Sequence, residues 1–214
     1  MSLARPQKKA VRAPSPLLIA AAEREIAENG YAGASMRRIA RRAGLKNVAA
    51  VQYHFGDLAG AVEAVFAFRA APIDAARARI IAAIAPAAPG IRPWVAAIVS
   101  PVADFMRSEP GGTFYLRFME AAVRGLGAQA IEASALIAPH YAIAVAALWA
   151  RAPQLREDDR LRRLRLAARF YISALADLEQ ALSAAAPAEA DRLRRIDEAE
   201  TDILGAAESM ILAP

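Results

Sequence analysis

Residues 35–55 constrain the fold of this chain more than any other stretch, because two short helical patterns there are joined by a tight turn. In the first pattern Met36, Ile39 and Ala40 recur at the spacing of one helical face, and arginines fill positions 37, 38, 41 and 42 on the opposite side. Ser35 precedes the pattern, and its hydroxyl can accept a hydrogen bond from an amide of the first turn. The sequence therefore predicts a short helix after Ser35 with one apolar and one basic face.

The turn that follows contains Gly44, which can adopt the left-handed conformation that ends a helix. A second short helix is predicted to start after Lys46 or Asn47, of which Asn47 is the better capping residue, and to run toward Phe55. A helix, a short turn with glycine and a second helix form the helix-turn-helix motif. In that motif the second helix enters the major groove of DNA.

Positive charge is concentrated in the same part of the chain. Residues 1–60 contain ten lysines and arginines against four acids, a net charge of +6, whereas the whole chain carries +5. The remaining residues therefore sum to −1. A basic N-terminal quarter on a nearly neutral body is the electrostatic pattern of a nucleic-acid-binding head attached to a separate core.

The residues that enzymes and metal sites need are scarce in this chain. It has no cysteine, two histidines far apart, no glycine-rich phosphate loop and no paired metal-ligand motif. We therefore expect no enzymatic activity, no metal and no cofactor. Apolar runs stop well short of the roughly 20 residues that span a bilayer, and none of signal-peptide length follows the basic N-terminus. A cytoplasmic location is expected.

Breakers and helical patterns divide the chain into three parts. Residues 1–13 are predicted to be a flexible basic tail, which either only aids solubility or contacts phosphates or the minor groove. Residues 14–57 are predicted to form three helices, the first starting at Ser15-Pro16 and ending at Asn29-Gly30. Residues 58–214 are predicted to form a helical body. No segment shows sustained strand alternation, so the predicted fold class is all-α.

A family resemblance rests on the segment AAAEREIAENGYAGASMRRIARRAGLKNVAAVQYHFGD. A helix ending in Gly-Tyr, a Ser-x-Arg-x-Ile-Ala helix, Ala-Gly and a Tyr-His-Phe exit occur here in the order and spacing found in the TetR family of bacterial transcriptional regulators. The resemblance covers Leu17 to about Val65. It implies a DNA-binding domain followed by an effector-binding and dimerisation domain at residues 58–214.

The sequence departs from the common family pattern at three points. One additional residue lies between Gly44 and Tyr53, Gln52 stands where many members have tyrosine, and Leu58 replaces an expected lysine. Gln52 could read adenine through its amide, because that group can hydrogen-bond N6 and N7 together. Leu58 removes one expected phosphate contact.

The resemblance places a set of donor side chains near the DNA backbone, where they fix position without reading sequence. They are Ser35, Arg37, Lys46, Asn47, Tyr53 and His54. Exposed positions of the second helix are the candidates for base edges and thymine methyl groups, namely Val48, Ala49 and Gln52. Met36, Ile39, Val51 and Phe55 are expected in the core.

Large side chains of the body helices are candidates for an effector pocket or, alternatively, for simple core packing. The helix with Phe114, Phe118 and Met119 is the preferred wall, and Arg117 and Glu120 could add a polar anchor. An apolar or aromatic effector is expected. The predicted lining is Trp94, Phe105, Phe114, Phe118, Met119, Tyr141, Trp149 and Tyr171, and Met106, Tyr115, His140 and Phe170 are further large residues of the same region.

Two apolar stripes near the C-terminus, separated by Ala186-Pro187, suit close antiparallel packing. In the family the equivalent helices form a four-helix bundle with a second copy, and packing within one chain is the alternative. The predicted dimer residues are Leu164, Ala168, Leu175, Leu178, Leu182, Ile196, Ile203 and Ala207.

By this resemblance the chain is expected to be a homodimeric repressor that leaves its DNA operator when a small effector binds. Two alternatives stay open, a ligand-independent architectural DNA-binding protein and an all-α enzyme.

Overall fold

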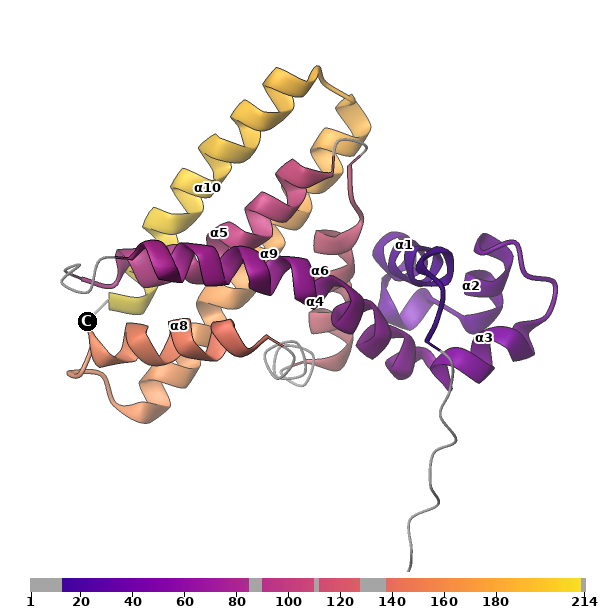
Figure 1. The fold of residues 1–214 in the computed structure, drawn as a ribbon, viewed down its shortest axis with the longest axis horizontal. Helices are drawn as coiled ribbons and strands as arrows, with labels where there is room; N and C mark the ends of the chain where they lie inside the picture. Colours follow the sequence, from indigo (N-terminus) through magenta and orange to yellow (C-terminus); the bar gives the residue numbers. More distant parts are fainter. Residues whose placement is uncertain (1–12, 85–89, 110–111, 128–137, 213–214) are drawn as a thin grey trace, which may run out of the picture.

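The computed structural model describes residues 13–84, 90–109, 112–127 and 138–212, and within these ranges every regular element is an α-helix (Figure 1). The predicted all-α fold class is thereby confirmed. Of the predicted N-terminal tail, residues 1–12 lie outside the described ranges.

Three helices form the N-terminal head: α1 (Pro16–Gly33), α2 (Met36–Arg42) and α3 (Val48–Phe55). The predicted start of α1 is confirmed, because Ser15 caps the helix, accepting a hydrogen bond from the Leu18 amide at 3.3 Å, and Pro16 occupies the first helical position. The predicted end is a kink rather than a stop. Gly30 adopts φ 69°, and one further turn follows it to Gly33.

The head has its own apolar interior, which the helical spacing anticipated. Leu18, Ala22 and Ile26 of α1 are buried, as are Ile39 of α2 and Val51 of α3. Because α2 packs against both α1 and α3, this shared interior sets the orientation of α3.

Helix α4 (Leu58–Ala83) connects the head to the body, as Figure 1 shows. Asp57 caps it by accepting a hydrogen bond from the Gly60 amide at 2.8 Å. Val62, Val65 and Phe66 are buried on one side of the helix, and Leu58 at its start is half-buried. The helix begins directly after the proposed domain boundary at residues 57 and 58.

The body contains α5 (Arg92–Ser108), α6 (Tyr115–Leu126), α8 (Pro139–Ala150), α9 (Glu157–Ala185) and α10 (Glu189–Leu212). Helices α9 and α10 form a long antiparallel pair joined at Ala186, which has φ 42° and lies at the predicted break before Pro187. Gly127 and Ala152-Pro153 also fall between helices. Residues 85–89 and 110–111 lie outside the described ranges.

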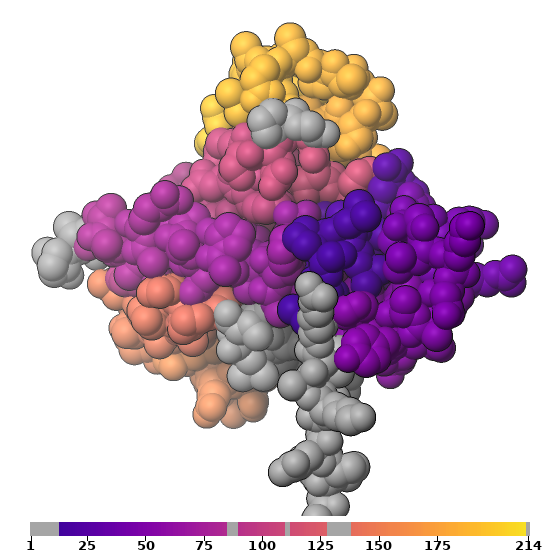
Figure 2. All heavy atoms as spheres, turned by 45° about the vertical axis from the view of Figure 1, so that its right-hand side comes forward, coloured from indigo at the N-terminus to yellow at the C-terminus, as the bar shows by residue number. Residues whose placement is uncertain are grey.

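Head and body meet mainly where α1 packs against α6 and α4. At this junction α1 and α6 approach so closely that a Cβ atom on Gly125 of α6 would lie 2.5 Å from the Cβ atom of Tyr31 of α1. Buried Glu23 of α1 forms a bidentate pair with Arg69 of α4, with N–O distances of 2.7 and 3.1 Å. Figure 2 shows the head on one side of the molecule and the α10 end of the body at the top. Helix α6 of the body is therefore in direct contact with the first helix of the head.

Candidate nucleic-acid interface and internal cavity

Short-range interactions fix the beginning of both helices of the motif. The Ser35 hydroxyl accepts a hydrogen bond from the Arg38 amide at 3.3 Å, and the Asn47 carboxamide accepts one from the Ala49 amide at 2.8 Å. Both predicted caps are confirmed, and the choice between Lys46 and Asn47 is decided for Asn47. Gly44 has φ 73°, the left-handed conformation expected at the turn.

The apolar side of the motif faces the head interior. Ile39, Val51 and Phe55 are buried, as expected for core residues, and Met36 is half-buried against the same cluster. This burial leaves the opposite side of α3 directed outward.

The outward side of α3 carries most of the predicted DNA-contacting residues. Ala49, Gln52 and Tyr53 are exposed, and Tyr53 is the most prominent because 61% of its surface is accessible. Val48 and His54 are half-buried, and the His54 ring contacts the Tyr53 ring edge to face with centroids 5.4 Å apart. Lys46 and Asn47 are exposed at the start of the helix.

The four arginines of α2 divide into two pairs. Arg38 and Arg42 turn toward α1, where the Glu25 carboxylate lies 2.5 Å from Arg38 Nε and 3.3 Å from Arg42 Nη2. Glu25 is only 1% exposed, and Arg42 also pairs with Glu28 at 2.7 Å. Two of the arginines expected on the outer basic face therefore brace the head internally. Helical spacing alone gives no sign of this division.

The other two arginines remain available to a partner. Arg37 and Arg41 are exposed on α2, and across the described residues neither they nor Lys46 forms an ion pair. Guanidinium and ammonium groups on a solvent-facing helical pair are suited to phosphate oxygens. With the amide of Gln52 beside them, the surface has groups for backbone contact and for base contact.

The comparison with protein families agrees with this geometry of the head. Residues 18–65 match the family model of bacterial regulatory proteins of the tetR family. The N-terminal domain belongs to the tetR family. The matched span covers α1, α2, α3 and the first residues of α4, which are the elements that build the surface just described.

One solved structure that is similar to this chain is a TetR transcriptional regulator from Rhodococcus sp. RHA1. It is 15% identical in sequence, with a TM-score of 0.47 over 92% of this chain and 94% of that chain. A comparison with curated proteins finds no match. On the evidence of its head, the chain is a DNA-binding transcriptional regulator with a helix-turn-helix motif.

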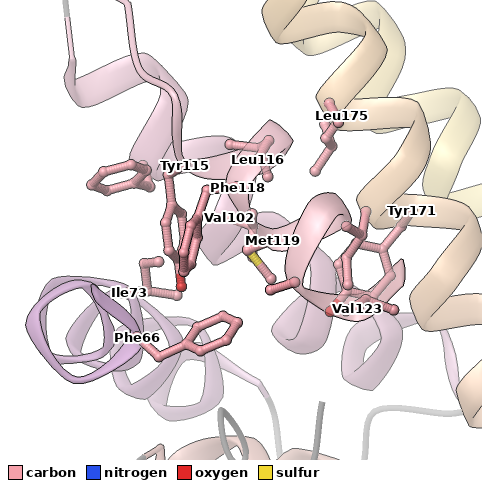
Figure 3. Close-up of a cluster of buried hydrophobic side chains, with 14 of the residues drawn as sticks. Phe66, Ile73, Val102, Tyr115, Leu116, Phe118, Met119, Val123, Tyr171 and Leu175 are labelled. Carbon is pink, nitrogen blue, oxygen red and sulfur yellow. The ribbon is translucent and has the colours of Figure 1, made fainter. Parts of the chain in front are cut away.

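The body contains a small cavity of about 50 Å³ between α4, α5, α6, α8 and α9. Three of the predicted pocket residues line it, Met119, Tyr141 and Tyr171. Figure 3 shows part of this region, where Phe66, Tyr115 and Met119 approach one another. The rest of the lining is Phe66, Ala70, Ile73, Arg77, Val102, Tyr115 and Ala138.

The remaining predicted pocket residues lie elsewhere. Phe105 and Phe118 are buried in the core, and Phe114 lines an open groove of about 370 Å³ between α6, α9 and α10. Trp94 packs beneath the guanidinium of Arg151, 4.8 Å from the ring centre, and Trp149 is half-buried against the core. Phe66 and Arg77 of α4 also line the cavity, although neither is among the predicted lining residues.

Arg77 belongs to a buried polar group next to the cavity. Its Nη1 donates to Asp74 at 3.0 Å and its Nε to the Ala97 carbonyl at 3.0 Å, while His140 Nδ1 lies 2.7 Å from the other Asp74 oxygen. Burial alone would raise the pKa of Asp74, but the hydrogen bonds from His140 and Arg77 outweigh it and lower the pKa. Asp74 therefore stays ionised at neutral pH.

The polar anchor expected at Arg117 and Glu120 has a different role. Glu179 of α9 accepts hydrogen bonds from the Leu116 and Arg117 amides at 3.1 and 3.0 Å and from Arg117 Nε at 3.1 Å. Arg117 thus fastens the start of α6 to α9. Glu120 binds Arg124 and Ser173 and does not line the cavity.

Most of the predicted dimer residues are covered by the chain itself. Leu164 and Leu178 are half-buried and keep some accessible surface. The others are buried within the single chain, namely Ala168, Leu175, Leu182, Ile196, Ile203 and Ala207. The alternative of packing within one chain therefore accounts for these six.

Two further observations concern the described residues only. They contain no group of three or more histidine, aspartate or glutamate side chains placed to hold a metal ion. None of the helices in the described ranges has the length and apolar character needed to cross a membrane.

Proposed function

We propose that this TetR-family regulator is a homodimeric repressor whose hold on its operator is weakened by a small effector bound in the body. The observation that carries the proposal is the solvent-facing side of α2 and α3. It carries the exposed side chains of Arg37, Arg41, Lys46, Gln52 and Tyr53, and within the described residues the first three form no ion pair. A cytoplasmic location belongs to the proposal, because the operator is chromosomal DNA.

The head residues divide by chemistry. We assign Ser35, Arg37, Lys46, Asn47, Tyr53 and His54 to the DNA backbone, and Arg41 joins them because it is exposed and unpaired across the described residues. Gln52 and Ala49 are exposed on α3 and are assigned to base edges, with Val48 beside them.

Control by an effector is supported by the position of α6, which contacts both the cavity and the head. This helix contributes Tyr115 and Met119 to the cavity, and it also packs against α1 of the head through the close approach of Gly125 to Tyr31. An effector that displaces α6 therefore moves α1. A coupling free energy of typically 1–3 kcal/mol would change operator affinity about 5–150-fold.

Dimerisation is supported by apolar side chains left uncovered at one end of the α9–α10 pair. Leu161 and Leu166 of α9 are 49% and 51% exposed, and Met210 of α10 is 37% exposed. The hydrogen bond from Arg163 to the Ile211 carbonyl at 2.8 Å places these two helix ends side by side. We infer that a second copy covers this patch, and two heads would then reach half-sites about 34–36 Å apart. The mass in solution, measured by light scattering, is expected to be that of two chains.

The experiment that tests DNA binding is a gel shift of the purified chain with its own promoter region at low and moderate salt. Arg37→Ala is expected to weaken binding to all sequences alike, because it removes a phosphate contact. Gln52→Ala is expected to change which base is preferred at one position of a randomised operator. Arg92→Ala is the matched control, since Arg92 is an exposed arginine of the body.

Absence of a shift at both salt concentrations would count against the proposal. An equal loss for every sequence in Gln52→Ala would refute its reading role. Operator binding that no small molecule alters, in a body that only dimerises, would favour the architectural alternative.

A further inference from the structure

The cavity in the body is lined by both apolar and polar side chains. Phe66, Ile73 and Met119 are among the apolar ones, and Figure 3 shows Tyr115 and Tyr171 on either side of Met119. The polar side chains are Arg77 and three tyrosines, and among the described residues the lining includes no carboxylate and no carboxamide.

Arg77 is the charged member of the lining and is only 4% exposed. Its Nε and Nη1 are occupied by Ala97 and Asp74, whereas Nη2 has no hydrogen-bond partner within the described part of the chain. Nη2 is not fully buried and keeps some accessible surface, so a group bound in the cavity can accept a charge-assisted hydrogen bond from it.

The tyrosine hydroxyls, like Arg77 Nη2, have no hydrogen-bond partner within the described part of the chain. Tyr115, Tyr141 and Tyr171 line the cavity, and in the described ranges none of their hydroxyls forms a hydrogen bond within the chain. Burial raises the pKa of all three, so each hydroxyl keeps its proton at neutral pH and can donate it. The described lining of the cavity thus includes a guanidinium and three phenols that can donate hydrogen bonds.

We propose that the cavity binds a small organic monocarboxylate, a short-chain or single-ring acid. Its carboxylate accepts hydrogen bonds from Arg77 Nη2 and from the tyrosine hydroxyls, and its apolar part packs against Phe66 and Met119. This inference rests on the proposed function and deepens it, because it names the chemical class of the effector.

Size limits the occupant and connects binding to α6. A cavity of about 50 Å³ holds a group of a few heavy atoms, whereas a benzene ring needs roughly 150 Å³. A ring acid must therefore displace a wall, and Met119 is the flexible side chain that can move. Because Met119 belongs to α6, the larger acid is expected to disturb the junction with α1 more than the smaller one.

The first test compares acids with their neutral amides on the full-length wild-type chain by titration calorimetry at pH 7.5. The pairs are propionate with propionamide and benzoate with benzamide, which match in shape and differ in charge. At least one acid is expected to bind ten times or more tightly than its amide. Equal affinity within both pairs, or no binding of either acid, would overturn the inference.

The second test locates the bound acid. Tyr115→Phe and Tyr171→Phe keep the ring and remove the hydroxyl, and each is expected to weaken acid binding several-fold and amide binding less, because a hydrogen bond to a carboxylate is stronger than one to a neutral carbonyl. Arg77→Lys is expected to weaken it further, because lysine cannot supply the same fork of donors. Tyr31→Phe, on α1 outside the cavity, is the control. Unchanged acid affinity in all three cavity variants would overturn the assignment to this cavity.

The gel shift separates this inference from the proposed function. An acid that binds according to the calorimetry and also releases the operator supports both. An acid that binds in the cavity without releasing the operator supports the ligand class and contradicts effector control.

Discussion

The head and the body use their polar side chains in opposite ways. In the head, Gln52, Tyr53 and Arg37 are exposed on two short helices whose starts are fixed by caps within three residues. In the body, Arg77, Tyr115 and Tyr171 are buried and come from three different helices.

The difference teaches how each region tolerates change. A surface that binds DNA depends on charge and on the orientation of α3, whereas an internal cavity depends on the packing of every helix around it. Substitutions that alter internal bracing should therefore cost folding free energy, and substitutions on the outer face of the head should cost only DNA affinity. Four predictions test this contrast, from the largest expected effect to the smallest.

Glu25→Gln should give the largest loss, because it removes the buried carboxylate that pairs with both Arg38 and Arg42. We expect the free energy of unfolding to fall by about 3 kcal/mol, the lower end for breaking a buried ion pair, since both arginines are partly accessible to water. Urea denaturation measures this. Glu28→Gln is the control, because Glu28 is 32% exposed at its side chain and should cost less than about 1 kcal/mol. Similar losses in both variants would contradict the bracing role of Glu25.

The buried acid of the body should make stability depend on pH. Burial raises the pKa of Glu179 to about 7 from its ordinary value of 4.5, against the opposing hydrogen bonds from Arg117 and Leu116. Between these values the folded chain holds a proton that the unfolded chain has lost, so the free energy of unfolding falls as the pH rises from 5 to 8. The expected fall is about 2–3 kcal/mol.

Glu179→Gln should remove this part of the pH dependence, measured as the difference between wild type and variant in urea denaturation at each pH. The opposite result is a wild-type chain that gains stability relative to Glu179→Gln as the pH rises. It would show that the Glu179 carboxylate is ionised throughout and that its hydrogen bonds outweigh the effect of burial on its pKa.

Gly125→Ala tests the junction where the two regions meet. The new Cβ atom would lie 2.5 Å from the Cβ atom of Tyr31, so α1 and α6 must separate. We expect a loss of about 1–2 kcal/mol in the free energy of unfolding, typical of overpacking, together with altered operator affinity in the gel shift. Gly33→Ala is the matched control on α1, because its Cβ atom would meet only Asn29 at 3.6 Å. A Gly125→Ala chain with unchanged stability and operator affinity would show that this contact does not join head to body.

The neighbouring arginines of α2 give the finest test. Arg41→Ala should leave stability unchanged within about 0.5 kcal/mol and lower the slope of log affinity against log salt by about 1, because it removes one phosphate contact. Arg42→Ala should lower the free energy of unfolding by about 1 kcal/mol, because Arg42 pairs with Glu25 and Glu28. The reverse pattern would mean that Arg41 braces the head and that Arg42 faces DNA.

Much of the head could be predicted from sequence because its determinants are local. Ser15, Ser35 and Asn47 each cap a helix through an amide two or three residues away, and Gly44 supplies the left-handed turn. The body was predictable only as a set of helices. Its cavity joins Arg77 to Tyr141 and Tyr171, and no periodicity in one helix reports which residues of another lie opposite.

By itself, then, the sequence determined the all-α class, the helix-turn-helix and the outward face of α3, because caps, turns and helical spacing act over a few residues. Only the tertiary structure decided which arginines are bound by Glu25, which lies 17 residues from Arg42 along the chain, and which apolar residues of α9 and α10 stay uncovered. Those outcomes depend on contacts between distant segments, where a side chain gains a partner only after the helices have packed.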